Sequence, residues 1–181
     1  INEQLIHGIP SKKVILKEGD IISCDIVAEL NGFMGDNTKT FRVGKVSEAA
    51  EKILKVTEEA LFKGIEQAVA GNRIGDISNA IQTHVESNGF QVCRKYIGHG
   101  IGREMHEDPE VPNFGRPGRG PRLCKGMTIA IEPMVNTNSP ENLTLKDGWT
   151  VVTTDGSLSC HFENTVAITD GEPIILTRPE H

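Results

Sequence analysis

The chain has 181 residues, of which 37% are hydrophobic and 24% are charged, and its formal net charge is -6 at pH 7. This length allows one domain with a substantial core, and the composition is that of a globular protein rather than a disordered one. No apolar run approaches the roughly 20 residues of a membrane span, and the acidic balance argues against a nucleic-acid surface, which would cluster Lys and Arg.

A β-hairpin is predicted near the start of the chain. Residues 19–30 and 33–43 are β-branched or alternating runs, and Asn31 and Gly32 separate them. An Asn-Gly pair between two such runs is a strong signal for a two-residue turn, because both residues tolerate positive φ.

This hairpin predicts a pair of neighbouring carboxylates. With a two-residue turn, Asp25 lies opposite Thr38, so Asp36 is a diagonal neighbour on the same face, about 7–8 Å away at the backbone. Asp25 shares that face with Ser23 and Val27. The other face is apolar and carries Ile22, Cys24, Ile26, Ala28 and Leu30. Taken alone, the two aspartates are more typical of ordinary exposed strand residues.

Two helices are predicted next. Ser47 is a suitable N-cap for a helix over 47–69, where apolar residues recur at helical spacing. A second helix is predicted over 74–87, and the Asn88-Gly89 pair that follows is a common C-terminal signal.

The rest of the chain reads mainly as strands, which gives an α+β fold class in a single domain. The predicted strands are 90–94, 127–135, 149–154, 158–169 and 173–177. A loop over 114–122 carries three arginines among glycines and prolines. Such a loop could hold a phosphate, but no aromatic residue is interleaved for base stacking, so a solvated loop is predicted.

Five potential metal ligands stand far apart in the sequence. They are Asp25, Asp36, His99, Glu132 and Glu163. Buried carboxylates are costly unless they are compensated, so this set makes sense if folding gathers it around a pair of metal ions. Three glycines surround His99 at positions 98, 100 and 102, where a close backbone can present the imidazole. The spacing is not that of a dinucleotide-binding loop.

Eight short blocks of the sequence, spread over essentially its whole length, resemble the signatures of type I methionine aminopeptidases. The blocks are His7-Gly-Ile-Pro10, Cys24-Asp-Ile26, Gly35-Asp36, Gly98-His-Gly-Ile-Gly102, His106-Glu-Asp-Pro109, Ile131-Glu-Pro-Met134, Lys146-Asp-Gly-Trp149 and His161-Phe-Glu-Asn164. This family belongs to the M24 metallopeptidases and has the pita-bread fold, a curved antiparallel sheet flanked by helices. The resemblance implies removal of the N-terminal methionine from nascent proteins and peptides.

The resemblance also implies a role for each ligand. Asp25 would chelate one metal, Asp36 and Glu163 would bridge both, and His99 and Glu132 would complete the other. A hydroxide bridging the two ions would attack the first peptide bond. Nitrogen and oxygen ligands of this kind suit Co, Mn, Fe or Zn.

Further residues are assigned by the same resemblance. Glu132 would also move the proton, His106 would hydrogen-bond the carbonyl oxygen, and His7 would contact the substrate backbone. Met105, which is phenylalanine in some family members, and Trp149 would line the methionine pocket, although Trp149 could instead be a core residue.

Three histidines have no assigned catalytic part. His161 is expected to support Glu163 from outside the ligand set. His84 and His181 are expected to be exposed to solvent.

The resemblance and the composition together suggest partners and a location. Four widely spaced cysteines without a C-x-x-C pair favour a reducing, cytoplasmic compartment. Family members carry an additional N-terminal segment, so the chain is expected to be truncated there, and a separate chain could supply that half. The ribosome is a further expected partner. The alternatives are an aminopeptidase P or prolidase of the same fold, and a peptide-binding module that has lost its metals.

Overall fold

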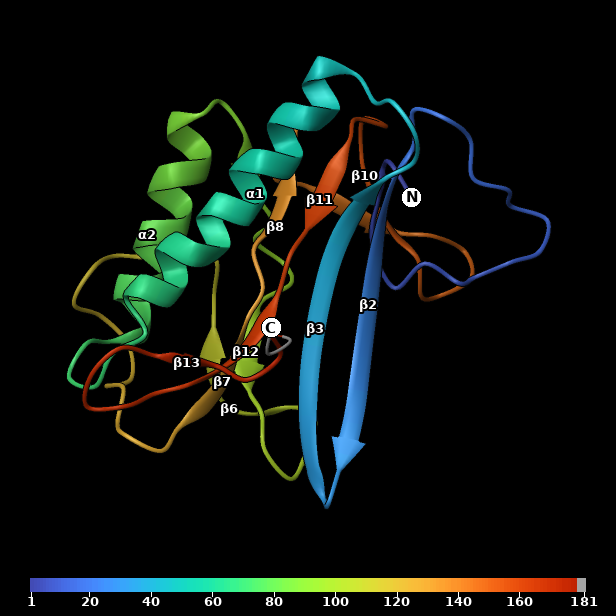
Figure 1. Cartoon of the computed structure of the whole chain (residues 1–181). Coiled ribbons are helices and arrows are strands. Elements are labelled where there is room, and N and C mark those ends of the chain that lie inside the picture. Colours follow the sequence, from blue (N-terminus) through green and yellow to red (C-terminus); the bar gives the residue numbers. More distant parts are fainter. Residues whose placement is uncertain (179–181) are drawn as a thin grey trace.

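Figure 1 shows the computed structural model of the chain, which describes residues 1–178. His181 therefore lies outside the described residues. Two helices lie side by side and cover strands that pair antiparallel throughout the described part. The predicted α+β organisation is confirmed. None of the described helices is long and apolar enough to cross a membrane.

The described strands form four groups. In spatial order, these are β1 (Gln4–Ile6), β10 (Val151–Thr153) and β9 (Asn142–Thr144); β11 (Ser159–His161), β8 (Met134–Asn136) and β4 (Gln91–Val92); β13 (Ile174–Ile175), β12 (Asn164–Ala167), β7 (Thr128–Ile131), β5 (Gly98–Gly100) and β6 (Glu107–Val111); and β2 (Ile21–Leu30) with β3 (Phe33–Arg42). Strands β1, β5, β6 and β9 were not predicted, because they are short and owe their extended form to their partners rather than to local sequence.

The β2–β3 hairpin has the predicted register. Leu30 pairs with Phe33 and Asp25 with Thr38. Asn31 and Gly32 have φ values of 53° and 80°, as the tight turn requires.

The hairpin packs through its polar face. On the apolar face Ile26 is 65% exposed and Leu30 is 74% exposed, whereas Asp36, Thr38 and Thr40 on the opposite face are all buried. This face lies against the segment around β11 and β12: the hydroxyls of Thr38 and Thr40 and the backbone amide of Asp36 donate hydrogen bonds to it. Hydrophobicity alone does not predict this, because the hydrogen-bond partners are more than 100 residues away in sequence.

The helices are α1 (Glu48–Glu66) and α2 (Ile74–Ser87). Ser47 caps α1 as predicted, since its side-chain oxygen accepts a hydrogen bond from the amide of Ala50 at 3.2 Å. Helix α1 ends at Glu66 rather than at 69, and α2 has its predicted bounds. Both helices bury their apolar stripes against the strands, which fixes the sheet layer that carries the site.

The prediction that His84 is exposed to solvent is wrong. Its side chain is 22% accessible, and Nε2 lies 3.1 Å from Glu59 Oε2 on α1. The two helices pack side by side, so the solvent-facing edge of α2 becomes a helix–helix contact.

Two predicted strands are interrupted. The run 127–135 divides into β7 and β8 at Glu132-Pro133, and the run 158–169 divides into β11 and β12 at Phe162-Glu163. Strand β7 pairs with β12 and β8 pairs with β11, so the two breaks lie side by side where one group of strands gives way to the next. Each break carries a glutamate into the interior.

Candidate metal centre

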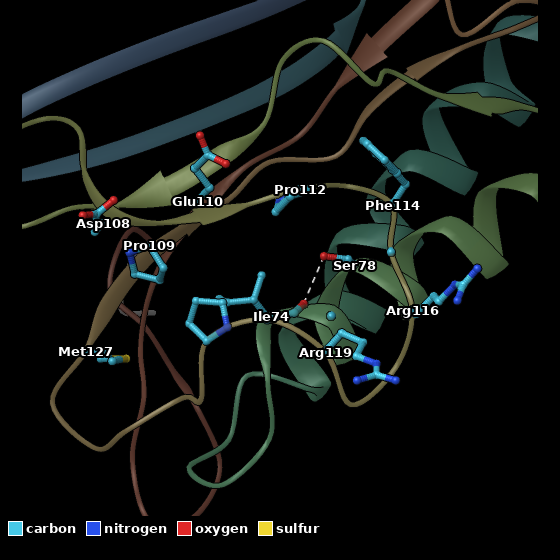
Figure 2. A pocket seen from close by; sticks show the side chains of 14 residues that line it. Ile74, Ser78, Asp108, Pro109, Glu110, Pro112, Phe114, Arg116, Arg119 and Met127 are labelled. Atoms are coloured by element: carbon cyan, nitrogen blue, oxygen red, sulfur yellow. Dashed lines mark hydrogen bonds between the residues drawn. The ribbon is translucent and has the colours of Figure 1, made fainter.

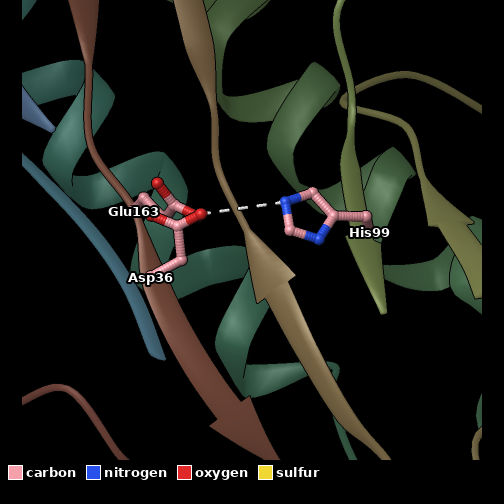
Figure 3. Close-up of side chains that lie close together, drawn as sticks. All are labelled: Asp36, His99 and Glu163. Atoms are coloured by element: carbon pink, nitrogen blue, oxygen red, sulfur yellow. Dashed lines mark ion pairs between the residues drawn. The ribbon is translucent and has the colours of Figure 1, made fainter. Parts of the chain in front are cut away.

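Four of the five predicted metal ligands meet at this junction. Glu132 and Glu163 come from the two strand breaks, and His99 lies on β5, where it pairs with Ala130 of β7. Asp36 reaches the same place from β3, and Figure 3 shows its carboxylate beside that of Glu163 and opposite the His99 ring.

The His99 ring presents a free nitrogen to the carboxylates. Its Nδ1 lies 2.9 Å from the carbonyl oxygen of Gly100, which can only accept, so Nδ1 carries the proton. Nε2 therefore offers a lone pair. It lies 3.9 Å from Asp36 Oδ2 and 3.5 Å from Glu132 Oε1. This is the arrangement of a histidine that is ready to bind a metal ion.

Hydrogen bonds from β3 hold Glu163, at the break between β11 and β12, in place. Thr38 Oγ1 donates to Glu163 Oε2 at 2.9 Å, and the Glu163 amide donates to the Thr38 carbonyl oxygen at 2.8 Å. Asn37 Nδ2 donates to the Glu163 carbonyl oxygen at 2.5 Å. The sequence analysis did not identify Thr38 or Asn37. For Thr38 the available signal was the run of polar residues at 36, 38 and 40 on one strand face.

The donor set fits divalent ions. One ligand atom each from Asp36, His99 and Glu163 lie within 4.8 Å of one another, and the same holds for Glu132, His161 and Glu163. Asp36 Oδ1, Glu163 Oε1 and His161 Nε2 are buried without a hydrogen-bond partner among the described residues. Unpartnered buried carboxylate oxygens are costly, and metal ions would compensate them.

Burial and mutual repulsion perturb two of these carboxylates. The pKa of Asp36 rises to about 6, because of burial first and then the nearby charges of Asp25 and Glu132. The pKa of Glu163 is also raised well above its ordinary value, by burial first and then by Glu132 and Asp36.

These shifts predict opposite pH dependences for the metal-free fold and for metal binding. The pKa of Asp36 is about 6 in the folded state against an ordinary value of 3.8, so its contribution to stability is present at low pH and is lost as pH rises through 6. Metal ions bind the deprotonated carboxylate, so their affinity rises over the same pH range. We expect metal binding at about pH 5.5 to release protons, measured by titration calorimetry in buffers of different ionisation enthalpy. Binding with no proton release at that pH would contradict this.

Asp25 stands apart from the buried cluster. It is exposed and belongs to neither of the close ligand groups. Its charge nevertheless raises the pKa of both Asp36 and Glu163, so it lies at the edge of the same site. Asp25 also lines a cavity of about 580 Å³ together with His7 and His161.

His106 and Met105 lie on the open side of the centre. The His106 ring is 4.3 Å from that of His99 between centroids, in an edge-to-face arrangement. Burial, followed by the nearby His99, lowers the pKa of His106, which favours its neutral form. Met105 is 38% exposed, so its side chain is available for contact.

His7 lies against two aromatic residues. Its ring is 6.1 Å from that of Tyr96 and 6.0 Å from that of Trp149, both edge to face. Trp149 is 63% exposed, which excludes the core alternative for this residue. His7 has a φ of 59°, a rare backbone conformation for a residue with a side chain.

The glycines around His99 are required by close packing. A Cβ on Gly98 would collide with the carbonyl oxygen of Ala130, and one on Gly100 with that of Asp108.

We expect Gly100→Ala to lower the free energy of unfolding by about 1–3 kcal/mol, because β5 must move away from β6. Urea unfolding would measure this. Gly171→Ala is the control, since its nearest neighbour is Thr169 Oγ1 at 3.9 Å. Equal stabilities for the two variants would contradict the prediction.

The arginine loop lies away from the candidate metal centre. Arg116 and Arg119 are exposed, as predicted for a solvated loop, and they border a cavity of about 700 Å³ that contains none of the five ligands (Figure 2). The loop backbone is nonetheless held against α2. The amides of Ile74 and Gly75 donate to the carbonyl oxygens of Pro121 and Arg119 at 3.0 and 2.9 Å.

The fold and the cluster define a class of protein. A family model described as metallopeptidase family M24 matches residues 1–170, and the chain belongs to this family. A methionine aminopeptidase of Clostridium acetobutylicum is 62% identical over 177 residues, which are 98% of this chain and 71% of that protein. The crystal structure of a methionine aminopeptidase from Thermotoga maritima matches with a TM-score of 0.97 and 49% identity, covering 98% of this chain and 72% of that one. The resemblance to methionine aminopeptidases and the pita-bread fold are thereby confirmed.

A structure of the alternative class is less similar. The prolidase from Pyrococcus furiosus matches with a TM-score of 0.75 and 26% identity, and the match covers 99% of this chain but 47% of the prolidase. The two classes share the fold, and the sequence favours the aminopeptidase.

Proposed function

We propose that this chain removes the N-terminal methionine from nascent proteins and peptides by metal-dependent hydrolysis of the first peptide bond. The observation that carries the proposal is the convergence of His99 Nε2 with carboxylate oxygens of Asp36, Glu132 and Glu163 in one buried cluster. Hydrolysis at such a centre needs an oxygen-rich pocket with an imidazole, and this chain supplies both.

The proposed metal ligands are the five residues Asp25, Asp36, His99, Glu132 and Glu163. When bound, two divalent ions would acidify water, polarise the scissile carbonyl and neutralise the carboxylates. These residues would hold the ions through their carboxylate oxygens and through His99 Nε2. The identity of the metal among Co, Mn, Fe and Zn would follow availability as much as affinity.

Three residues would act on the substrate directly. Glu132 would accept a proton from the attacking water and return it to the leaving amine. His106, beside His99 and with a lowered pKa, would donate a hydrogen bond from its neutral ring to the carbonyl oxygen as charge develops there. His7 would contact the substrate backbone from between Tyr96 and Trp149.

Two exposed apolar side chains would form part of the methionine pocket. Met105 and Trp149 are both available for contact. Methionine is flexible and polarisable, and contacts between its sulfur and an aromatic ring are favourable.

The test is release of free methionine from a Met-Ala-Ser peptide in the presence of Co²⁺ or Mn²⁺, compared with cleavage of an Xaa-Pro peptide. Methionine release that is lost on chelation and in Glu132→Ala would support the proposal. Preference for the Xaa-Pro bond would favour the prolidase alternative. Absence of both cleavage and metal binding would favour a peptide-binding module.

Partners and location follow from this activity. A role at nascent N-termini implies the cytoplasm and transient contact with the ribosome, and residues 1–181 would form one catalytic domain. Co-sedimentation with ribosomes would test the ribosome contact.

A further inference from the structure

His161 is buried beside the cluster with one ring nitrogen unpartnered. His161 is 2% exposed, and its Nε2 has no hydrogen-bond partner among the described residues. Hydrogen bonds and strand pairing hold the backbone of His161 in place. The His161 amide donates to Thr40 Oγ1 at 3.2 Å, and Thr40 Oγ1 donates to the His161 carbonyl oxygen at 2.6 Å. Pairing with Met134 on β8 fixes the other side.

The unpartnered nitrogen faces Glu132 rather than the residue that it was expected to support. His161 Nε2 lies 3.5 Å from Glu132 Oε2. Glu163 Oε2 instead accepts a hydrogen bond from Thr38 Oγ1 at 2.9 Å. His161 was predicted to support Glu163, but in the structure it contacts Glu132.

Glu132 therefore lies between two imidazoles that offer different groups. Its Oε1 is 3.5 Å from His99 Nε2, which carries a lone pair. Its Oε2 is the oxygen turned towards His161. The carboxylates around them can only accept when ionised, so a proton on His161 Nε2 would find an acceptor there.

We infer that His161 is a positioning residue, which donates a hydrogen bond from Nε2 to Glu132 Oε2 and thereby keeps Oε1 directed towards the metal ions. The inference rests on the proposed function of Glu132 as ligand and proton carrier. A carboxylate held at one oxygen cannot rotate away from its ligand position, and outer hydrogen-bond partners commonly orient metal ligands in this way. Shortening of the present contact to about 2.8 Å would give a charge-assisted hydrogen bond.

The competing role is direct metal ligation. A ring nitrogen of His161 lies within 4.8 Å of ligand atoms of Glu132 and Glu163, so a sixth ligand is geometrically conceivable. The two roles differ in what Nε2 carries, because a donor keeps its proton and a ligand gives it up.

Nitrogen NMR of the metal-loaded chain separates these roles. The chain is labelled with ¹⁵N-histidine and loaded with ¹¹³Cd²⁺, and His161→Gln assigns the His161 signals. We expect ¹¹³Cd coupling at His99 Nε2, and a protonated, uncoupled Nε2 at His161. Coupling at His161, or an unprotonated and uncoupled Nε2, would overturn the inference. Absence of coupling at His99 as well would instead contradict the proposed metal centre itself.

Two variants test the consequence for catalysis. We expect His161→Leu to lower kcat by about 10–100-fold with KM changed less than about threefold, because Glu132 loses its orientation. His161→Gln retains an N–H donor and should stay within about fivefold of the original chain in kcat. Equal losses in both variants, or none in either, would overturn the inference. Circular dichroism checks folding, and if His161→Leu fails to fold, the NMR result alone decides.

Discussion

Replacing Glu132 by glutamine is expected to lower kcat for methionine release by about 10³-fold at saturating metal. Glutamine keeps the shape of the side chain but cannot carry the proton from water to the leaving amine. It also offers a weaker oxygen ligand, so the measurement needs saturating Co²⁺ or Mn²⁺, with metal content determined by mass spectrometry. Full metal content with lost turnover would separate proton transfer from ligation.

A matched control for this variant is Glu110→Gln. Glu110 lies on β6, the neighbour of the His99 strand, but it is exposed and lines the other cavity. We expect the kcat of Glu110→Gln to stay within about twofold of that of the original chain, since surface substitutions away from special features have little effect. Turnover by Glu132→Gln at the level of this control would rule out a catalytic part for Glu132.

Replacing Glu163 by glutamine is expected to have opposite effects on the metal-free and metal-loaded protein. Glu163 is 2% exposed, and its Oε1 has no partner among the described residues. Burial and neighbouring carboxylates raise its pKa, so the ionised form is unfavourable in the metal-free fold. A neutral amide removes that cost, and we expect the free energy of unfolding without metal to rise by about 1–3 kcal/mol at neutral pH.

With metal present the same variant should lose stability relative to the original chain. A ligand that binds only the folded state stabilises it by about 2.7 kcal/mol at 100 times its dissociation constant, and weaker binding removes most of that gain. Thermal unfolding without and with Mn²⁺ measures the expected gain in stability of the metal-free variant and its expected loss in the metal-loaded state. Glu58→Gln, an exposed residue on α1, is the control and should change neither value. A destabilised metal-free Glu163→Gln would contradict the repulsion argument.

Local sequence signals predicted the elements that carry the site. The Asn31-Gly32 turn fixed the hairpin register, and with it the shared face of Asp25 and Asp36. Side chains alternate strictly along strands, so a correct turn determines the faces of both strands. Ser47 and helical periodicity likewise predicted the two helices to within a few residues.

Local signals failed where partners are distant. The apolar face of β2 turned out to be the exposed one, because Thr38 and Thr40 have hydrogen-bond partners around β11 and β12. The division of 127–135 and 158–169 into separate strands also depends on which strands they pair with, although Pro133 was a partial signal.

The sequence by itself determined the kinds of ligand, their order and the family resemblance, because these depend on residue identity and spacing alone. The tertiary structure decided which groups meet. It gathered Asp36, His99, Glu132 and Glu163 in the interior, left Asp25 at the edge, and turned His161 towards Glu132 rather than Glu163. The physical reason is that hydrogen bonds and strand pairing between distant segments set these orientations, and neither is encoded in local periodicity.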